Sequence, residues 1–571
     1  MPASHNSARS SSDSPRVSGD KVEGAYHEEN LSRVISTEGV GTVTVDNSNG
    51  LHRGLTNRKL QLVAIGSSIG TALFLAIGGT LNKSGPGNLF IGFILYNIVL
   101  CLANNCMAEM TVYMPVGGSF VRLAGHWVDD ALGFCAGWNF FLYQALTIPF
   151  EITALSLILS FYSENIPAAA ITAAAIVGYV LLNIFAVRIY GEAEFWLASG
   201  KVLLLTILLL FTFVTAVGGN PAHDAYGFRY WYDPGAFPEY RSTGALGGFE
   251  AFIAALFFAA FTCVGPEYVG MAAAESQHPR TYVKTSFKIV YLRVLIFFCG
   301  GALAVGVLVP WNDPVLEAVY RQGTHSANAA ASPYIIAMKN LNIPVLPYII
   351  TALLTTTIFS AGNNATFCAS RTLYGLALEG RAPAILKKCT KSGIPIYAFG
   401  VTTLFALLGF LQLSNSSATV LSWLINLTTG AIIIDYIIVA ITYICFYKAC
   451  RVQNFDRSKL PYQGWFQPYG AWIVLIFEFL IMFFSGYATL EPFVVSGFIT
   501  TYFLPVLVPL LYVGWKVMHK TKWLKPEEVD LIWEAPLITA YEDSAEEPPV
   551  GFWADLRNSF LRKRKAHRAE A

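Results

Sequence analysis

Charge and histidine are scarce in this sequence of 571 residues. Only 13% of the residues are Asp, Glu, Lys or Arg, whereas 54% are hydrophobic, and this balance excludes an ordinary soluble protein. The formal net charge of +1 argues against a nucleic-acid partner. All nine histidines fall in expected tails, loops or span edges, so we do not expect a histidine proton relay inside the membrane.

Spacing typical of metal sites or disulfide frameworks is also missing. The nine cysteines lie mostly inside apolar runs, so we expect them to pack as small apolar residues. No span or loop presents a nucleophile beside a base, a metal cluster or a phosphate-binding loop, so we expect neither an enzyme nor a cofactor. The first 50 residues are polar and rich in serine, and we therefore expect no cleavable signal peptide.

Apolar runs of about 20 residues, long enough to cross the hydrocarbon core of a bilayer, recur along most of the chain. They predict an all-α polytopic membrane protein with about twelve transmembrane helices. The expected spans are residues 59–81, 87–111, 131–161, 168–188, 193–217, 246–273, 285–309, 344–374, 395–413, 418–447, 470–490 and 494–517.

The expected membrane core covers residues 58–518 and lies between two polar tails. Residues 1–57 lack periodicity and are interpreted as a disordered tail, and residues 519–571 as a second tail. The loops on one side carry about twenty Lys and Arg, against five on the other. The positive-inside rule therefore predicts that both termini are cytoplasmic.

The first expected span is interrupted at its centre. Residues 64–74 read AIGSSIGTALF, with glycines and hydroxyls between apolar flanks. Glycine lowers helix stability, and a spanning helix needs none to satisfy its own backbone. The pattern predicts a local unwinding, where free N–H groups and a half-helix N-terminus meet a carboxylate. Close helix packing through small residues is the alternative.

A second span, residues 255–275, is interrupted by Gly265 and Pro266, which are followed by Glu267. Proline removes a backbone donor and clashes with the preceding helical turn. If the chain consists of two similar halves, each interruption lies in the first helix of a half. Paired interruptions of this kind predict a transporter site at the bilayer midplane.

Ionisable residues inside a membrane usually face a partner or a wet cavity. Glu151 has Thr147 on the same helix face, beside a proline kink, which suits an amine-binding or proton-accepting position. The alternative is a carboxylate bonded to a neighbouring helix. Lys201 either loses its proton easily and takes the place of a sodium ion, or extends to the inner surface.

Four further ionisable residues lie in expected spans. Glu267 is expected to cap the broken helix or to brace the site from behind. Asp435 has only apolar neighbours and a tyrosine. We expect it either to pair with a basic residue of another span or to offer a second anion to a cationic substrate. Arg293 and Glu478 are interpreted as structural, because they lie near span ends or in lipid-facing patterns.

Short motifs follow one another in a specific order along residues 58–525. They are IGTALF (69–74), PFEI (149–152), GEAEFW (191–196) with Lys201, GFRYW (227–231), HPR (278–280), VPWNDP (309–314), SPY (332–334), ASRTLYG (369–375) and QPYG (467–470). In this order they resemble the fungal amino-acid permeases of the amino acid–polyamine–organocation superfamily.

The resemblance implies a LeuT-like fold of two inverted five-helix repeats, residues 58–217 and 245–448, followed by two trailing helices at 470–518. It also implies import of amino acids or related zwitterions across the plasma membrane, by proton symport with alternating access. The implied substrate-binding residues are Ser68, Ile69, Gly70 and Thr71 for the carboxylate, Phe261, Thr262 and Gly265 for the amino group, and Thr147 and Glu151 in the third helix.

Four residues carry a further implied role. Phe261 is expected to act as a gate. Lys201 matches a lysine that replaces the sodium site in proton-coupled relatives. Together with Glu151 and Glu267, it is expected to couple transport to protons.

Departures from the family pattern indicate a divergent subgroup. Ser67 and Ala72 replace glycines that are usual in the first helix, and Pro266 replaces the usual Thr or Ile in the sixth. With the segments 360–364 and 416–426, they are closest to permeases linked to polyamine and carnitine uptake or its regulation. Two alternatives therefore stay open: a polyamine or carnitine permease in which Asp435 contacts a second cationic centre, and a nutrient sensor that does not transport. The sequence leaves the preferred substrate and the oligomeric state open.

Overall fold

A computed structural model describes residues 53, 55–163, 166–185, 187–320, 332–390, 393–490 and 493–545 of the chain, without the side chains of residues 63, 187–195 and 488. The expected tail at residues 1–57 lies outside this description except at its end, and so does the last part of the C-terminal tail from residue 546.

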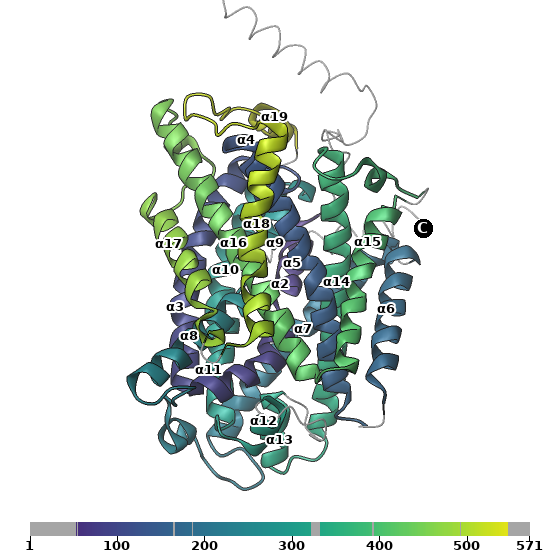
Figure 1. Cartoon of the computed structure of the whole chain (residues 1–571), viewed down its shortest axis with the longest axis vertical. Coiled ribbons are helices and arrows are strands. Elements are labelled where there is room, and N and C mark those ends of the chain that lie inside the picture. The colour runs from purple at the N-terminus through teal and green to yellow at the C-terminus, as the bar shows by residue number, and fades with distance from the viewer. Residues whose placement is uncertain are drawn as a thin grey trace, which may run out of the picture. The chain divides into compact units, whose positions relative to one another are not determined.

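The described residues are nearly all helical and contain no β-strand. This confirms the expected all-α polytopic membrane fold. The α-helices are α2 (Asn57–Ser68), α3 (Ile77–Tyr113), α4 (Ser119–Trp127), α5 (Asp130–Leu159), α6 (Ala168–Phe185), α7 (Val187–Ala216), α8 (Ala245–Thr262), α9 (Pro266–Met271), α10 (Lys284–Arg293), α11 (Gly300–Leu308), α12 (Pro314–Tyr320), α13 (Pro333–Asn340), α14 (Leu346–Leu378), α15 (Ile396–Ala406), α16 (Ser417–Val452), α17 (Tyr469–Phe484), α18 (Val495–His519) and α19 (Ala535–Ser544) (Figure 1).

Nine helical elements of the described chain are long and apolar enough to cross a membrane. The first, Ala72–Tyr113, contains parts of two expected spans, 59–81 and 87–111. These two parts meet at a bend at Gly85, where φ is 70°. A side chain at Gly85 would stand 2.2 Å from Pro238, so only glycine fits this bend. Two expected spans lie outside the nine: residues 344–374 correspond to α14, and residues 470–490 to the shorter apolar helix α17.

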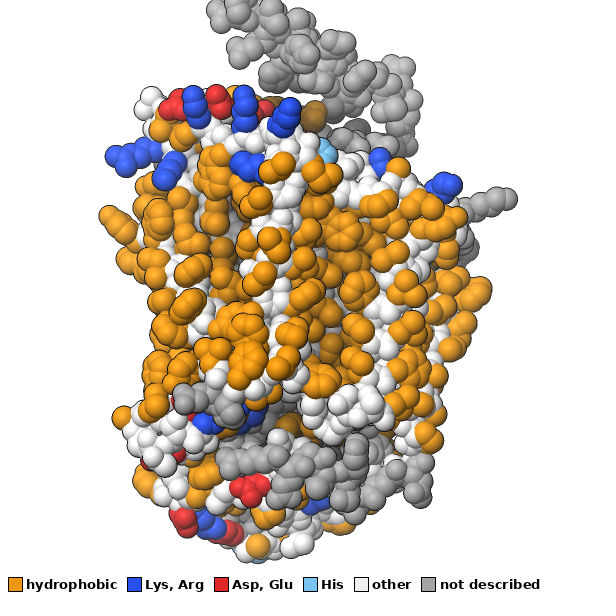
Figure 2. Space-filling view, viewed as in Figure 1, with side chains coloured by type: hydrophobic (Ala, Val, Ile, Leu, Met, Phe, Trp, Pro, Cys, Tyr) orange, Lys and Arg blue, Asp and Glu red, His pale blue; other side chains and the backbone are white. Residues whose placement is uncertain are grey.

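Apolar side chains cover the middle of the bundle, and charged side chains gather at its two ends (Figure 2). Leu203 and Phe213 on α7 and Val513 on α18 are among the exposed large apolar residues. Such a broad apolar surface is unfavourable in water and suits contact with lipid tails. Helices α4 and α19 lie at one end of the bundle, the α19 end, and α12 and α13 at the opposite end, the α12 end (Figure 1).

The C-terminal segment of the described chain packs on the α19 end. The Tyr113 hydroxyl donates to the carbonyl of Leu531 at 2.6 Å, and Arg122 forms an ion pair with Glu534 at 2.8 Å. His126 stacks on the ring of Trp533, with 3.8 Å between ring centroids. Residues 531–534 are therefore fixed to α3 and α4.

A short segment a few residues after α9 bonds to residues near both ends of the described chain. Leu55 donates its N–H to Glu275 O at 2.8 Å and accepts from the N–H of Gln277 at 3.0 Å. The Tyr541 hydroxyl donates to Gln277 O at 3.0 Å, and the N–H of Arg280 donates to Glu542 at 2.8 Å. The start of α2 and helix α19 are thus tied to one short segment, residues 275–280.

A buried ion pair joins α3 to the loop after α16. The carboxylate of Glu109, fully buried in α3, accepts two bonds of 2.9 Å from Arg457. It also accepts from the Tyr443 hydroxyl at 2.8 Å and from the N–H of Gly464 at 2.7 Å. All of its neighbours are donors, so the carboxylate is stable only while they stay in place.

We expect Arg457→Ala to destabilise the protein by about 3–5 kcal/mol, because it leaves a buried carboxylate without its cation. The measurement is the apparent melting temperature of the full chain in detergent, which should fall by several degrees. Arg457→Lys should restore part of the loss. Arg451→Ala removes an exposed arginine just upstream and serves as the control. Equal melting of the Arg457→Ala and Arg451→Ala proteins would contradict the assignment.

Candidate functional site

The predicted interruption of the first span is present. Helix α2 ends at Ser68, and Ile69 is extended, with φ −95° and ψ 103°. Helical geometry resumes at Thr71 and continues through a π-helical turn, Ala72–Ala76. Such turns occur frequently at functional sites, and the new N-terminus presents N–H groups that lack a helical partner.

The second predicted interruption is present as well. Helix α8 ends at Thr262, Cys263 is extended, and α9 begins at Pro266. Gly265 has φ 151°, a backbone geometry that favours glycine, and proline suits the first position of a helix. The N–H of Gly265 donates to both carboxylate oxygens of Glu267, at 3.2 and 3.1 Å. Glu267 therefore caps the break, which is one of the two roles expected of it from the sequence.

The two breaks lie side by side. A Cβ atom at Gly265 would stand 3.6 Å from the Cβ of Ser68 and 3.8 Å from Nη2 of Arg293. The carbonyls at the end of α8 and the N–H groups at the start of the helical segment that follows Gly70 thus lie in one region. A small zwitterion needs acceptors and donors in this combination.

Glu151 reaches the first break from α5. Its side chain is only 3% exposed, and its Oε2 accepts a hydrogen bond from the Thr71 hydroxyl. A Cβ at Gly70 would stand 3.5 Å from Oε1. The Thr147 hydroxyl donates to the carbonyl of Tyr143 in its own helix, at 2.8 Å, and so does not bond Glu151.

Lys201 of α7 approaches the same break from the other side. Its ammonium donates to the carbonyl of Gly66 at 2.9 Å, and the residue is 1% exposed. The alternative that Lys201 extends to the inner surface is therefore wrong. Gly66 and Thr71 flank the break, so the cation and the carboxylate contact its opposite sides.

A polar stretch of α14, residues 360–364, also contacts the first break. From the sequence, this stretch is seen only as a departure from the family pattern. Asn364 donates to the Ser67 hydroxyl at 2.8 Å. A Cβ at Gly362 would stand 2.0 Å from the hydroxyl oxygen of Tyr179 and 3.1 Å from the Cβ of Glu151. The close contact among α14, α6 and α5 thus depends on Gly362. The sequence contained one signal for this contact, namely Gly362, Asn363 and Asn364 in an otherwise apolar helix.

Glu267 and Asp435 lie behind the second break, where they line one small void with Tyr143 and Tyr436. The Tyr436 hydroxyl donates to Glu267 at 2.8 Å. Asp435 accepts from the amide of Asn139 at 2.9 Å. Within the described chain Asp435 forms no ion pair, so the expectation of a basic partner is wrong.

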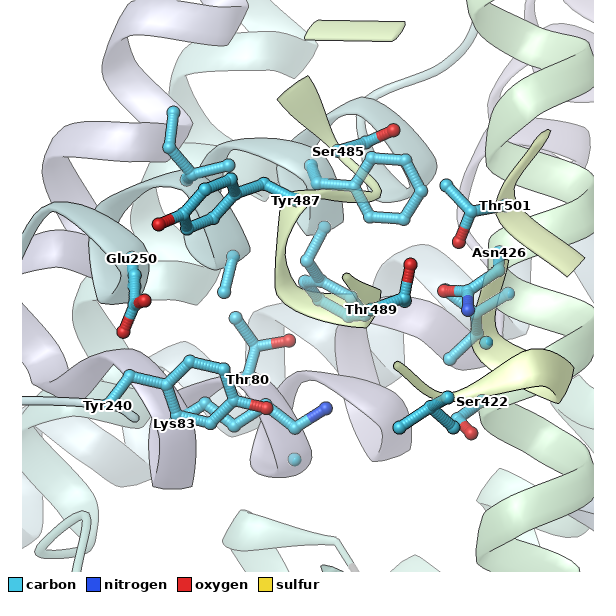
Figure 3. A pocket seen from close by; sticks show the side chains of 18 of the residues that line it. Thr80, Lys83, Tyr240, Glu250, Ser422, Asn426, Ser485, Tyr487, Thr489 and Thr501 are labelled. Carbon is cyan, nitrogen blue, oxygen red and sulfur yellow. The ribbon is translucent and has the colours of Figure 1, made fainter. Parts of the chain in front are cut away.

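An aromatic layer separates the breaks from a cavity of about 550 Å³. The ring of Phe261 packs against Phe150, with 5.1 Å between centroids, and against Phe258, with 5.9 Å. Phe258 also lines the cavity. Figure 3 shows Tyr240 and Glu250 on one side of this cavity and Asn426 on the other. Its lining includes Gly79 and Thr80 of α3, but none of the residues of the two breaks.

Arg293 and Glu478 are buried, so the lipid-facing pattern on which their structural interpretation rested is wrong. Glu478 is fully buried in α17. Arg293 is 5% exposed, and its Nη1 lies 3.5 Å from the Ser68 hydroxyl, which places it at the first break. Arg293 is therefore a charged residue of the site, although from the sequence it is interpreted as a structural residue outside the site.

Comparison with known proteins gives a consistent result along most of the chain. The family model described as Amino acid permease matches residues 59–527. The general amino acid permease AGP2 of Saccharomyces cerevisiae is 40% identical over 86% of this chain and 83% of its own. The dicarboxylic amino acid permease of the same yeast is 35% identical (85% and 80%), and its lysine-specific permease is 32% identical (88% and 82%). These names cover substrates of different charge, so similarity of this degree does not identify the substrate.

We expect Gly362→Ala to impair substrate binding, because the added methyl group displaces Tyr179 and Glu151. Overpacking of this kind corresponds to about 1–3 kcal/mol. Gly375→Ala in the same helix is the control, since a Cβ there has no neighbour within 4 Å. The measurement is uptake at matched surface expression. Equal uptake by the two variants would show that the α14 contact does not shape the site.

Proposed function

Because the chain belongs to the amino acid permease family, we propose that this membrane transporter, which is not an enzyme, imports amino acids by proton symport with alternating access. Family membership agrees with the resemblance seen in the sequence. The proposal is carried by one observation: two helix breaks lie in contact, with an acid and a base bonded on either side of the first.

The substrate is proposed to bridge the breaks. N–H groups at the start of the helical segment that follows Gly70 receive the carboxylate. Carbonyls of Phe261 and Thr262, at the end of α8, receive the amino group. The ring of Phe261 then closes the path to the 550 Å³ cavity.

Proton coupling is proposed to act through the two bonds across the first break. Protonation of Glu151 changes the acceptor of the Thr71 hydroxyl into a donor, and deprotonation of Lys201 weakens its bond to Gly66. Either change alters how the two half-helices are held. Glu267, bonded to Gly265 and Tyr436, extends the same coupling to the second break. The protonation states of these groups then bias which face of the transporter is open.

We propose that the protein resides in the plasma membrane, with both termini in the cytoplasm. The excess of Lys and Arg in alternate loops supports this orientation, because positive loops stay on the cytoplasmic side. In Figure 2, Lys and Arg side chains are prominent at the end of the bundle that carries α19. On this orientation the α19 end is the cytoplasmic end, and the 550 Å³ cavity opens near the outer ends of α8 and α16.

The test of the proposed function is uptake of a panel of labelled amino acids, with polyamines and carnitine, by cells that lack other permeases. A protonophore should abolish accumulation above the external concentration. Flux of polyamine or carnitine alone would favour the polyamine or carnitine permease. Ligand-dependent signalling without flux of any compound would favour the sensor.

Lys201→Ala and Glu151→Gln should each lose concentrative uptake. Lys201→Ala removes the bond to Gly66, whereas Glu151→Gln can keep the bond from Thr71 but can no longer take up and release a proton. Lys448→Ala removes an exposed lysine of α16 and should behave as wild type. The measurement is the ratio of internal to external labelled amino acid at steady state. If both variants accumulate substrate as wild type does, the coupling assignment is wrong.

A further inference from the structure

Arg293 is a buried cation near the middle of a membrane span. The span is Pro279–Leu308, so 14 residues precede Arg293 within it and 15 follow. The residue is 5% exposed. No acidic side chain of the described chain forms an ion pair with it, and its Nε has no hydrogen-bond partner there.

A guanidinium does not lose its proton in a protein, so this charge is permanent. A permanent charge at membrane depth is costly unless an anion or a set of acceptors surrounds it. The nearest acceptor is the Ser68 hydroxyl at 3.5 Å from Nη1, at the outer limit of hydrogen-bond distance. Within the described chain the guanidinium therefore has one weak hydrogen bond at Nη1 and none at Nε, so a bound anion would satisfy its donors.

The position of the guanidinium identifies where that anion binds. One nitrogen lies beside Ser68, the last residue of α2, and the other would lie 3.8 Å from a Cβ at Gly265. Arg293 thus faces both breaks, where the proposed substrate binds. A π-helical turn, Val294–Cys299, begins immediately after Arg293, and such turns shift the helical register at functional sites.

Glu267 is the nearest competing explanation. Its carboxylate interacts with the guanidinium through space but lies beyond the 4.0 Å of an ion pair. Its oxygens already accept bonds from the N–H of Gly265 and the hydroxyl of Tyr436. Glu267 therefore reduces the electrostatic cost of Arg293 without filling its donors.

We propose that Arg293 binds a carboxylate of the transported molecule, and that the substrate class is limited to compounds that carry one. This inference rests on the proposed function and narrows it. The planar fork of donors matches a carboxylate in two-point contact, whereas a polyamine offers only positive charge to the same guanidinium. Amino acids and carnitine fit the site, and polyamines do not.

The test compares the full-length protein with Arg293→Met, Arg293→Lys and Arg451→Met. Methionine keeps an unbranched side chain and removes the buried charge, so we expect the variant to fold. Binding of alanine, glutamate and putrescine is measured on purified protein, by ligand-induced thermal stabilisation. Competition for uptake is measured in cells.

The affinities of the Arg293→Met protein for alanine and glutamate should fall at least about tenfold, because a charge-assisted contact is lost. Arg293→Lys should give an intermediate loss, Arg451→Met none, and putrescine should bind no better to wild type than to Arg293→Met. Equal losses for both amino acids assign the contact to the α-carboxylate. A loss confined to glutamate assigns it to a side-chain carboxylate.

Unchanged amino-acid affinity in Arg293→Met would overturn the proposal. Recovery of affinity in the double variant Arg293→Met with Glu267→Gln would also overturn it, since Arg293 would then serve only to balance Glu267. If Arg293→Met fails to fold, the same comparison is made with Arg293→Lys, where unchanged affinity overturns the proposal. Absence of uptake by the wild type refutes the proposed function alone, because the binding measurement does not depend on transport.

Discussion

A peptide group inside a lipid bilayer needs a partner, because no water is available to bond it. This constraint explains why the described helices are long and why their interruptions occur where protein surrounds them. Helix α2 stops at Ser68 and α8 stops at Thr262, and both ends are buried. The free backbone groups at these ends are tolerable only with nearby side chains or a ligand as partners. Charged residues of the core, namely Glu151, Lys201 and Glu267, supply such partners at the breaks.

Side chains satisfy this need unequally at the two breaks. The second break is largely closed on itself, since Glu267 accepts from Gly265 and is fixed by Tyr436. The first break instead has contacts with ionisable side chains on its flanks, Lys201 at Gly66 and Glu151 at Thr71. A break that is capped by its own helix and a break that is bordered by an acid and a base therefore lie side by side. This asymmetry suits a site that must hold a ligand and also respond to its protonation.

The sequence predicted the breaks because glycine and proline act locally on the backbone. Gly265, with φ 151°, and Pro266, at the first position of α9, both interrupt a helix through their own backbone geometry. The sequence did not reveal the role of Arg293, because its direction depends on the helix register. The π-helical turns beside it change that register, and a hydropathy pattern does not show them. The partners of Asp435 and Tyr179 were equally hidden, since they come from other helices.

The hydrogen bonds that hold residues 275–280 have a mechanical consequence. This segment lies a few residues after α9, and it is bonded to Leu55 on one side and to Tyr541 and Glu542 on the other. In the alternating-access transport proposed above, a movement of α9 away from α2 would first have to break these bonds. They would then add to the activation barrier for opening at the α19 end. The lifetime of each closed conformation would thus depend on a segment that does not contact the substrate.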